Sequence, residues 1–151
     1  MKNIIKFISK IFAAARVVAV NMQLVGVHPD GVITEKSGAA LPLQNALVKY
    51  DDAGNAVAAG AADIPVGAVN DTAEAAGEYV GVSLLGSRAG TVVLVASAAI
   101  AKGAKLAPAA GGKVKTAAAA EIQVGVAVTS ASADGDEIEV AHNAPFKLPA
   151  A

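Results

Sequence analysis

Several residue types that carry much of protein chemistry are missing or scarce in this chain of 151 residues. It has no cysteine, which excludes disulfide bonds, thiolate metal sites and a cysteine nucleophile. Its two histidines, His28 and His142, are too few for a histidine metal site without help from carboxylates. We therefore expect no cofactor and no metal site.

Large aromatic side chains are equally scarce. Tryptophan is absent, and the aromatic residues are Phe7, Phe12, Tyr50, Tyr79 and Phe146. The hydrophobic share is 54%, but alanine supplies much of it. Because burial stabilises by only about 25 cal/mol per Å², a core of such small side chains gains little free energy. We expect assembly, with itself or with something larger, to supply part of the stability.

The formal net charge is only −1, which predicts binding neither to nucleic acid nor to an acidic membrane. The distribution of charge is uneven, however. The first twenty residues contain Lys2, Lys6, Lys10 and Arg16 and no acid, so the remainder carries a net charge of about −5. A basic tip therefore precedes a mildly acidic body.

The N-terminal segment has the spacing of an amphipathic helix. Its lysines recur every four residues, and the apolar side chains fall on the other side: Ile4, Ile5, Phe7, Ile8, Ile11 and Phe12. We expect residues 1–22 to form a helix or arm ahead of a β domain over 23–151.

Four roles compete for this segment. A signal peptide is disfavoured because Lys6 and Lys10 interrupt the apolar stretch. A helix on a membrane surface and a helix packed on its own domain are the next two. The interpretation that we favour is a docking helix, which lays its apolar face on a partner or on a neighbouring subunit.

After Met22 the pattern changes to short apolar runs separated by Gly, Pro, Asn and Asp. The first run is interrupted by a turn signature at 28–31. The others lie at 46–50, 66–69, 79–85, 91–96, 113–115, 124–129 and 137–141. Short strands with regular turn signals predict a mainly β fold, either a small β-barrel or a β-sandwich.

The body also repeats itself. Residues 64–82, IPVGAVNDTAEAAGEYVGV, are followed 58 residues later by IQVGVAVTSASADGDEIEV at 122–140. Twelve of thirty-seven positions are identical when 46–82 is compared with 104–140. Half of these are alanine, so the matched glycines carry the argument. We predict two similar units of about 58 residues, with the repeat spanning 41–85 and 99–143.

The matched glycines sit where turns or close contacts are expected. Positive φ suits the hairpin tips and turns, and glycine inside a strand indicates a close backbone approach. These predicted structural glycines are Gly54 and Gly112, Gly67 and Gly125, and Gly77 and Gly135. Upstream, 41–48 aligns with 99–106, which pairs Asn45 with Gly103, the two residue types that best tolerate a left-handed backbone.

No constellation typical of catalysis is present. The segment AAGGKVK at 109–115 lacks the spacing of a phosphate-binding loop, and no serine stands in a G-x-S-x-G context. The acids at 134–137 lack the pattern of a calcium loop and are expected to be solvated turn residues. We therefore expect a protein that is not an enzyme.

Residues 90–145 resemble the small capsid decoration proteins, also called cement or head-stabilising proteins, of tailed bacteriophages. The phrases that carry the resemblance are I-x-x-G-x-x-L at 100–106, G-K-V at 112–114, x-V-G-V-A at 123–127 and G-D-x-I-x-V at 135–140. Residues 40–85 match more loosely, and the N-terminal segment lies outside the resemblance.

The resemblance implies a structural virion protein on the outer surface of a phage capsid. Such a protein bridges neighbouring major capsid subunits and stabilises the expanded head, commonly as a homotrimer and in some cases as a dimer. The expected capsid contacts are Lys2, Ile4, Ile5, Lys6, Phe7, Ile8, Lys10, Ile11 and Phe12. A helical arm departs from those decoration proteins whose N-terminal arm is extended, so the helical form is an expectation from this sequence alone.

Two alternatives remain open. The first is a secreted or surface-exposed β-sandwich module that binds carbohydrate or a host receptor, although the few aromatic side chains argue against stacking on sugars. The chain could also serve as the capsid-anchoring base of a head fibre, although the short segment after Phe146 leaves no room for a fibre shaft.

Overall fold

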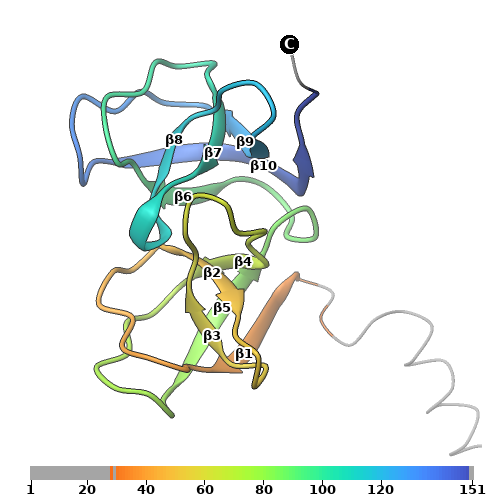
Figure 1. Cartoon of the computed structure of the whole chain (residues 1–151), viewed down its shortest axis with the longest axis vertical. Coiled ribbons are helices and arrows are strands. Elements are labelled where there is room, and N and C mark those ends of the chain that lie inside the picture. Colours follow the sequence, from red (N-terminus) through yellow and green to blue (C-terminus); the bar gives the residue numbers. More distant parts are fainter. Residues whose placement is uncertain (1–27, 29, 150–151) are drawn as a thin grey trace, which may run out of the picture.

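A computed structural model describes residue 28 and residues 30–149, which form an almost entirely β structure (Figure 1). The strands make two five-stranded sheets in which neighbours are antiparallel. The first sheet, in the order β1-β5-β4-β2-β3, contains β1 (Val32–Lys36), β2 (Leu47–Tyr50), β3 (Ala56–Ala58), β4 (Gly67–Val69) and β5 (Tyr79–Leu84). The second sheet, in the order β6-β10-β9-β7-β8, contains β6 (Val92–Val95), β7 (Lys105–Pro108), β8 (Val114–Thr116), β9 (Ile122–Ala127) and β10 (Glu137–Lys147). A short 3-10 helix, η1 (Ala110–Gly112), lies between β7 and β8.

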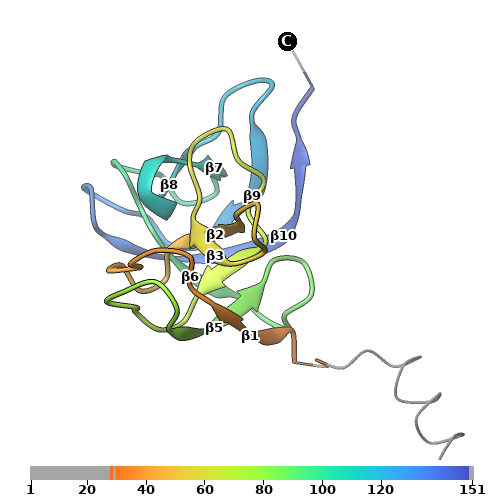
Figure 2. The same ribbon diagram turned by 60° about the horizontal axis from the view of Figure 1, so that its bottom comes forward.

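Each sheet is built from one continuous stretch of chain. We call residues 32–84 unit 1, residues 92–147 unit 2, and residues 85–91 the linker. The two units lie one above the other in Figure 1. Turning the molecule brings unit 1 forward (Figure 2). The strands of each unit pair only within that unit's own sheet. The prediction of a mainly β fold with two similar units is confirmed, and the units form one sheet each.

Unit 2 repeats the backbone pairing of unit 1. The Asn45 N–H donates to the Val69 carbonyl at 2.9 Å, and 58 residues later the Gly103 N–H donates to the Ala127 carbonyl at 2.8 Å. The φ angles of Asn45 and Gly103 are 62° and 84°. An asparagine in one unit therefore adopts the left-handed conformation that a glycine adopts in the other.

The outer strands of each sheet meet at one end. Isolated parallel bridges join Ser37 to Ala56 in unit 1 and Ala96 to Val114 in unit 2. Because these residues lie next to or in the first and third strands, each sheet curls back on itself. Each unit thereby encloses a small core of its own.

The offset between the units changes upstream of Asn45. The Leu41 N–H donates to Ala73 O at 2.8 Å, and the Ile100 N–H donates to Ala131 O at 2.9 Å, so Leu41 corresponds to Ile100. The alignment of Leu41 with Ala99 expected from the sequence is wrong by one residue. The reason is that unit 1 has one more residue between Leu41 and Asn45 than unit 2 has at the same place.

The two cores use equivalent positions. In unit 1 the buried side chains are Leu41, Val48, Ala56, Val69, Ala73, Val80 and Val82. In unit 2 they are Ile100, Leu106, Val114, Ala127, Ala131, Ile138 and Val140. Three of the seven side chains are larger in unit 2, namely Leu106, Val114 and Ile138, whereas Ala127 is smaller than its counterpart Val69. Alternation along the strands directs these residues inward, so the shared pattern produces the same fold twice.

The contact between the units is not symmetrical. Leu47, Ala59, Ala68 and Leu85 belong to unit 1 or the linker, yet they pack in the same hydrophobic cluster as the core of unit 2. The tip of the β7–β8 hairpin lies against this surface, with the Gly112 N–H donating to Ala59 O at 2.8 Å. The counterpart of Leu47 in unit 2 is Lys105, which is exposed. Unit 2 therefore covers the face of unit 1 that carries Leu47, whereas the equivalent face of unit 2, which carries Lys105, is exposed to solvent.

The predicted strand glycines lie at close backbone approaches. A Cβ on Gly67 would stand 2.4 Å from Ser83 O, and one on Gly125 would stand 2.6 Å from a Val140 methyl group. Both distances are shorter than side-chain atoms tolerate, so the neighbouring strand requires glycine here. The turn glycines predicted from the sequence have positive φ angles; they are Gly54, Gly77, Gly103, Gly112 and Gly135.

Candidate functional site

A cleft opens where the end of unit 1, the linker and the start of unit 2 meet. It encloses about 170 Å³. Its polar lining consists of Asn45, Asn70, Ser83, Arg88 and Thr91, and its apolar lining of Ala68, Val92 and Val93. We call this the junction cleft. The junction cleft gathers five polar side chains, one of which is the cation Arg88.

Arg88 is held in place within the junction cleft. Its guanidinium donates to Ser83 Oγ, and Ser83 Oγ donates in turn to Asn70 Oδ1 at 2.7 Å. Ser83 is only 2% exposed, and its hydroxyl group has a donor on one side and an acceptor on the other. The chain of hydrogen bonds fixes the direction of the guanidinium group.

Two carboxylates lie at the edge of the cleft. Asn45 Nδ2 donates to Glu137 Oε1 at 2.9 Å, which ties unit 1 to unit 2. Thr91 Oγ1 donates to Glu139 Oε1 at 2.7 Å. The edge of the cleft therefore carries negative charge, whereas its interior carries the positive charge of Arg88.

The linker that carries Arg88 is itself anchored. The Gly86 N–H donates to His142 Nδ1 at 2.8 Å, and a Cβ on Gly86 would lie 2.5 Å from Ala144 N. Because Nδ1 accepts this hydrogen bond, the proton of neutral His142 lies on Nε2. His142 thus connects the linker to β10.

A second hollow, of about 380 Å³, lies between the units near the C-terminal end of β10. It is lined by Ala61, Ala62, Ala120, Glu121, Ile122 and Lys147. Its one carboxylate, Glu121, is already bound within its own turn. This hollow therefore presents mainly small apolar side chains.

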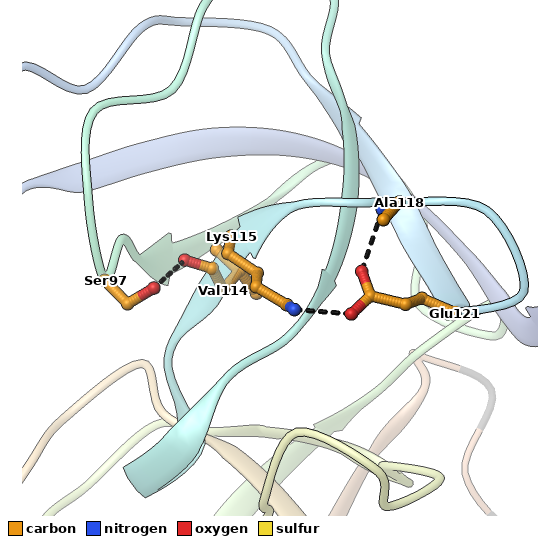
Figure 3. Close-up of polar contacts among 5 residues, drawn as sticks. All are labelled: Ser97, Val114, Lys115, Ala118 and Glu121. Carbon is orange, nitrogen blue, oxygen red and sulfur yellow. Dashed lines mark hydrogen bonds and ion pairs between the residues drawn. The ribbon is translucent and has the colours of Figure 1, made fainter.

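Acidic side chains in the turns mostly serve the fold. Glu121 accepts hydrogen bonds from the Ala118 N–H at 2.8 Å and from Lys115 (Figure 3). Figure 3 also shows the neighbouring hydrogen bond from Ser97 Oγ to Val114 O. Asp63, the counterpart of Glu121, accepts from the Gly60 N–H at 2.7 Å. The lysine partner differs, because Asp63 pairs with Lys49 at 2.9 Å. The turn geometry is repeated, while the strand that supplies the lysine is not.

Asp136 closes the turn before β10. Its Oδ2 accepts hydrogen bonds from the hydroxyl and N–H groups of Ser132, both at 2.7 Å, and from the Ala133 N–H at 3.0 Å. The Ser132 hydroxyl and backbone bonds, followed by the Ala133 bond, lower the pKa of Asp136. The acids predicted at 134–137 as turn residues therefore include one that organises the turn.

Acid will destabilise the protein through such turns. Hydrogen bonds also lower the pKa values of Asp51, Asp63 and Glu121. The stabilisation is complete above the unfolded-state pKa of about 4 and is lost as pH falls through the lower folded-state values, because the unfolded chain takes up protons first. We expect the free energy of unfolding, measured by urea denaturation, to be level near neutral pH and to fall below about pH 4.

Asp136→Asn tests this assignment. It should lower stability at neutral pH and flatten the acid dependence, because amide groups do not titrate. Asp52→Asn is the matched control, since the Asp52 carboxylate makes no hydrogen bond or ion pair with the described residues. An equal response of the two variants to pH would contradict the role of Asp136.

Within residues 28 and 30–149, no group of three or more His, Cys, Asp or Glu side chains is arranged to hold a metal ion. In the same residues, no helix has the length and apolar character needed to cross a membrane. The capsid-contact residues predicted from the sequence, from Lys2 to Phe12, lie outside the described residues.

Sequence reasoning missed the residues of the junction cleft. Ser83 and Arg88 belong to no recognisable motif, and Asn70 begins only the pattern Asn-Asp-Thr at 70–72, which fits a glycosylation acceptor but is common by chance. The one available signal was Arg88 itself, the single arginine after residue 16, placed in the segment GSRAG at 86–90. A comparison of the chain with protein-family models and with curated proteins finds no match.

Proposed function

We propose that this chain is a structural virion protein that binds the outer surface of a phage capsid and stabilises the expanded head. The observation that carries the proposal is a duplicated β unit whose second copy contains the phrases that resemble capsid decoration proteins. Those phrases at 100–106, 112–114, 123–127 and 135–140 fall on strands and turns of unit 2. The phrases form strands and turns of the fold, as expected for a protein that binds the capsid and stabilises it.

Two physical effects would make a small β protein an effective brace. A protein that binds only the expanded lattice stabilises that state by mass action. Many copies attached to one shell act together, so that modest affinity at each position is sufficient. The major capsid protein is the proposed partner, and further copies of this chain, as a trimer or a dimer, are the proposed neighbours.

The N-terminal segment would extend the contact beyond the two units. Its apolar residues from Ile4 to Phe12 would lie on a capsid subunit, and Lys2, Lys6 and Lys10 would face acidic capsid groups. Burying several large apolar side chains contributes about 1.5–3 kcal/mol for each one that is fully covered. The segment is therefore expected to supply much of the affinity.

Deleting residues 2–20 should weaken binding to expanded capsids by at least about tenfold, equivalent to about 1.4 kcal/mol. The melting temperature should stay close to that of the full chain, because the strands and the two hydrophobic cores are built from residues 32–147. Co-sedimentation with purified capsids measures the first effect and calorimetry the second.

A charge variant separates the two parts of the contact. Changing Lys2, Lys6 and Lys10 to Gln keeps the apolar face, so it should reduce the salt dependence of binding more than the affinity at high salt. Undiminished binding of the deleted form would remove the segment from the contact. Failure of the full chain to bind either expanded or unexpanded capsids would overturn the proposed function.

A further inference from the structure

We propose that the junction cleft is a binding site for a carboxylate group, with Arg88 as its principal contact. This inference does not depend on the capsid role. It rests on the free donors of Arg88, on their fixed direction and on the charges around the cleft.

The guanidinium group of Arg88 has N–H donors that make no hydrogen bond with the described residues. A guanidinium group has five N–H donors in a planar fork, and two of them match the two oxygens of a carboxylate. One Arg88 donor is used by Ser83. The ion pairs found among residues 30–149 all use lysines, and none includes Arg88. The charge of Arg88 is thus left without a carboxylate partner in this part of the chain.

The site is built before a ligand arrives. Ser83 is buried and donates its own proton to Asn70, so its oxygen is free to accept from Arg88. The linker that carries Arg88 is anchored by the hydrogen bond from Gly86 to His142. A cation held in this way loses less side-chain entropy on binding than a free surface lysine does.

The dimensions and charges select the kind of carboxylate. A volume of about 170 Å³ is well above the ~10–15 Å³ that a cavity needs to hold one water molecule, so the cleft has room for a carboxylate on a short stem. Glu137 and Glu139 at the edge repel a second negative charge and attract hydrogen-bond donors. The preferred ligand is therefore a single carboxylate accompanied by N–H groups, as in an Asp or Glu side chain on a polypeptide, and a phosphate dianion is disfavoured.

The two arginines of the chain make the test direct. Arg16→Lys leaves Arg88 as the only source of an arginine Nε–H signal in NMR spectra. In this background we expect sodium acetate to shift the Arg88 signal in a saturable manner. A blocked glutamyl dipeptide should bind at least about threefold more tightly than acetate, and phosphate at equal ionic strength should give no saturable shift.

Variants separate the site from general charge effects, with backbone amide shifts near Ser83 as the readout. Arg88→Lys keeps the charge but loses the fork, so binding should weaken at least about tenfold. Ser83→Ala should weaken carboxylate binding several-fold. A cooperative melting curve checks that this variant is still folded. Lys105→Gln, which removes an exposed charge that does not line the cleft, should leave binding unchanged.

Each outcome decides the question. Saturation by acetate and tighter binding of the dipeptide support an acidic side chain of a protein partner as the source. Saturation by acetate without tighter binding of the dipeptide supports the same site, with a small free carboxylate as its ligand. Shifts that never saturate with either ligand, or equal binding by Arg88→Lys, would overturn the proposal.

Discussion

Replacing Leu47 by alanine will lower the free energy of unfolding by about 2–5 kcal/mol, the range for a buried leucine that leaves a cavity. Leu47 has an exposed fraction of 0% and packs in one cluster with the core of unit 2, although it belongs to unit 1. The lost contacts are therefore those that hold the two units together. Urea denaturation followed by circular dichroism measures the change.

The duplicated fold supplies a matched control. Lys105 occupies the position in unit 2 that Leu47 occupies in unit 1, and it is exposed, so Lys105→Ala should change stability by no more than about 0.5 kcal/mol. We also expect a single cooperative transition for the unaltered chain, because one cluster spans both units. A loss below about 1 kcal/mol for Leu47→Ala would mean that the units do not pack as described.

Gly112→Ala is the second change with a large expected effect, and Gly54→Ala is its control. Both glycines sit at the tip of a hairpin with positive φ angles, 75° and 81°, so alanine costs about 1–2 kcal/mol at either position. The surroundings differ. A Cβ on Gly112 would lie 2.7 Å from Leu47 O and 2.8 Å from the Ala46 Cβ, whereas a Cβ on Gly54 meets no atom within 4 Å.

The difference between the two variants isolates the contact between the units. We expect Gly112→Ala to cost about 1–3 kcal/mol more than Gly54→Ala, the usual penalty for overfilling a packed site. The hydrogen bond from the Gly112 N–H to Ala59 O would be strained at the same time. Thermal unfolding of both variants under identical conditions gives the comparison, and equal destabilisation would show that the hairpin tip does not press on unit 1.

The strands that were predicted and those that were missed differ in local pattern. The runs at 66–69, 79–85 and 91–96 became β4, β5 and β6 with shifts of one residue at their ends. β3 and β7 were missed because their sequences, AVA and KLAP, are too short or too mixed to show alternation. Pairing with β2 in one unit and with β8 and β9 in the other makes them strands. Alternation within a segment of three or four residues does not show that it will pair with another strand.

β10 shows the same limit at its far end. The apolar run predicted a strand that ends at residue 141, yet β10 continues to Lys147 after a register shift between His142 and Phe146. The continuation pairs Phe146 with Gln123 and Lys147 with Ile122. A bulge of this kind depends on the partner strand, so alternation along one segment does not reveal it.

By itself, the sequence determined the β class, the presence of two similar units and the positions of the turns. These follow from local preferences, because alternation selects strands and only glycine or asparagine readily adopts a left-handed backbone. The tertiary structure alone decided that each unit forms its own sheet, that Leu47 is covered while Lys105 is exposed, and that Arg88 meets Ser83 and Asn70 in a cleft. Burial and side-chain contact depend on which distant segments meet, and that is a property of the packed chain.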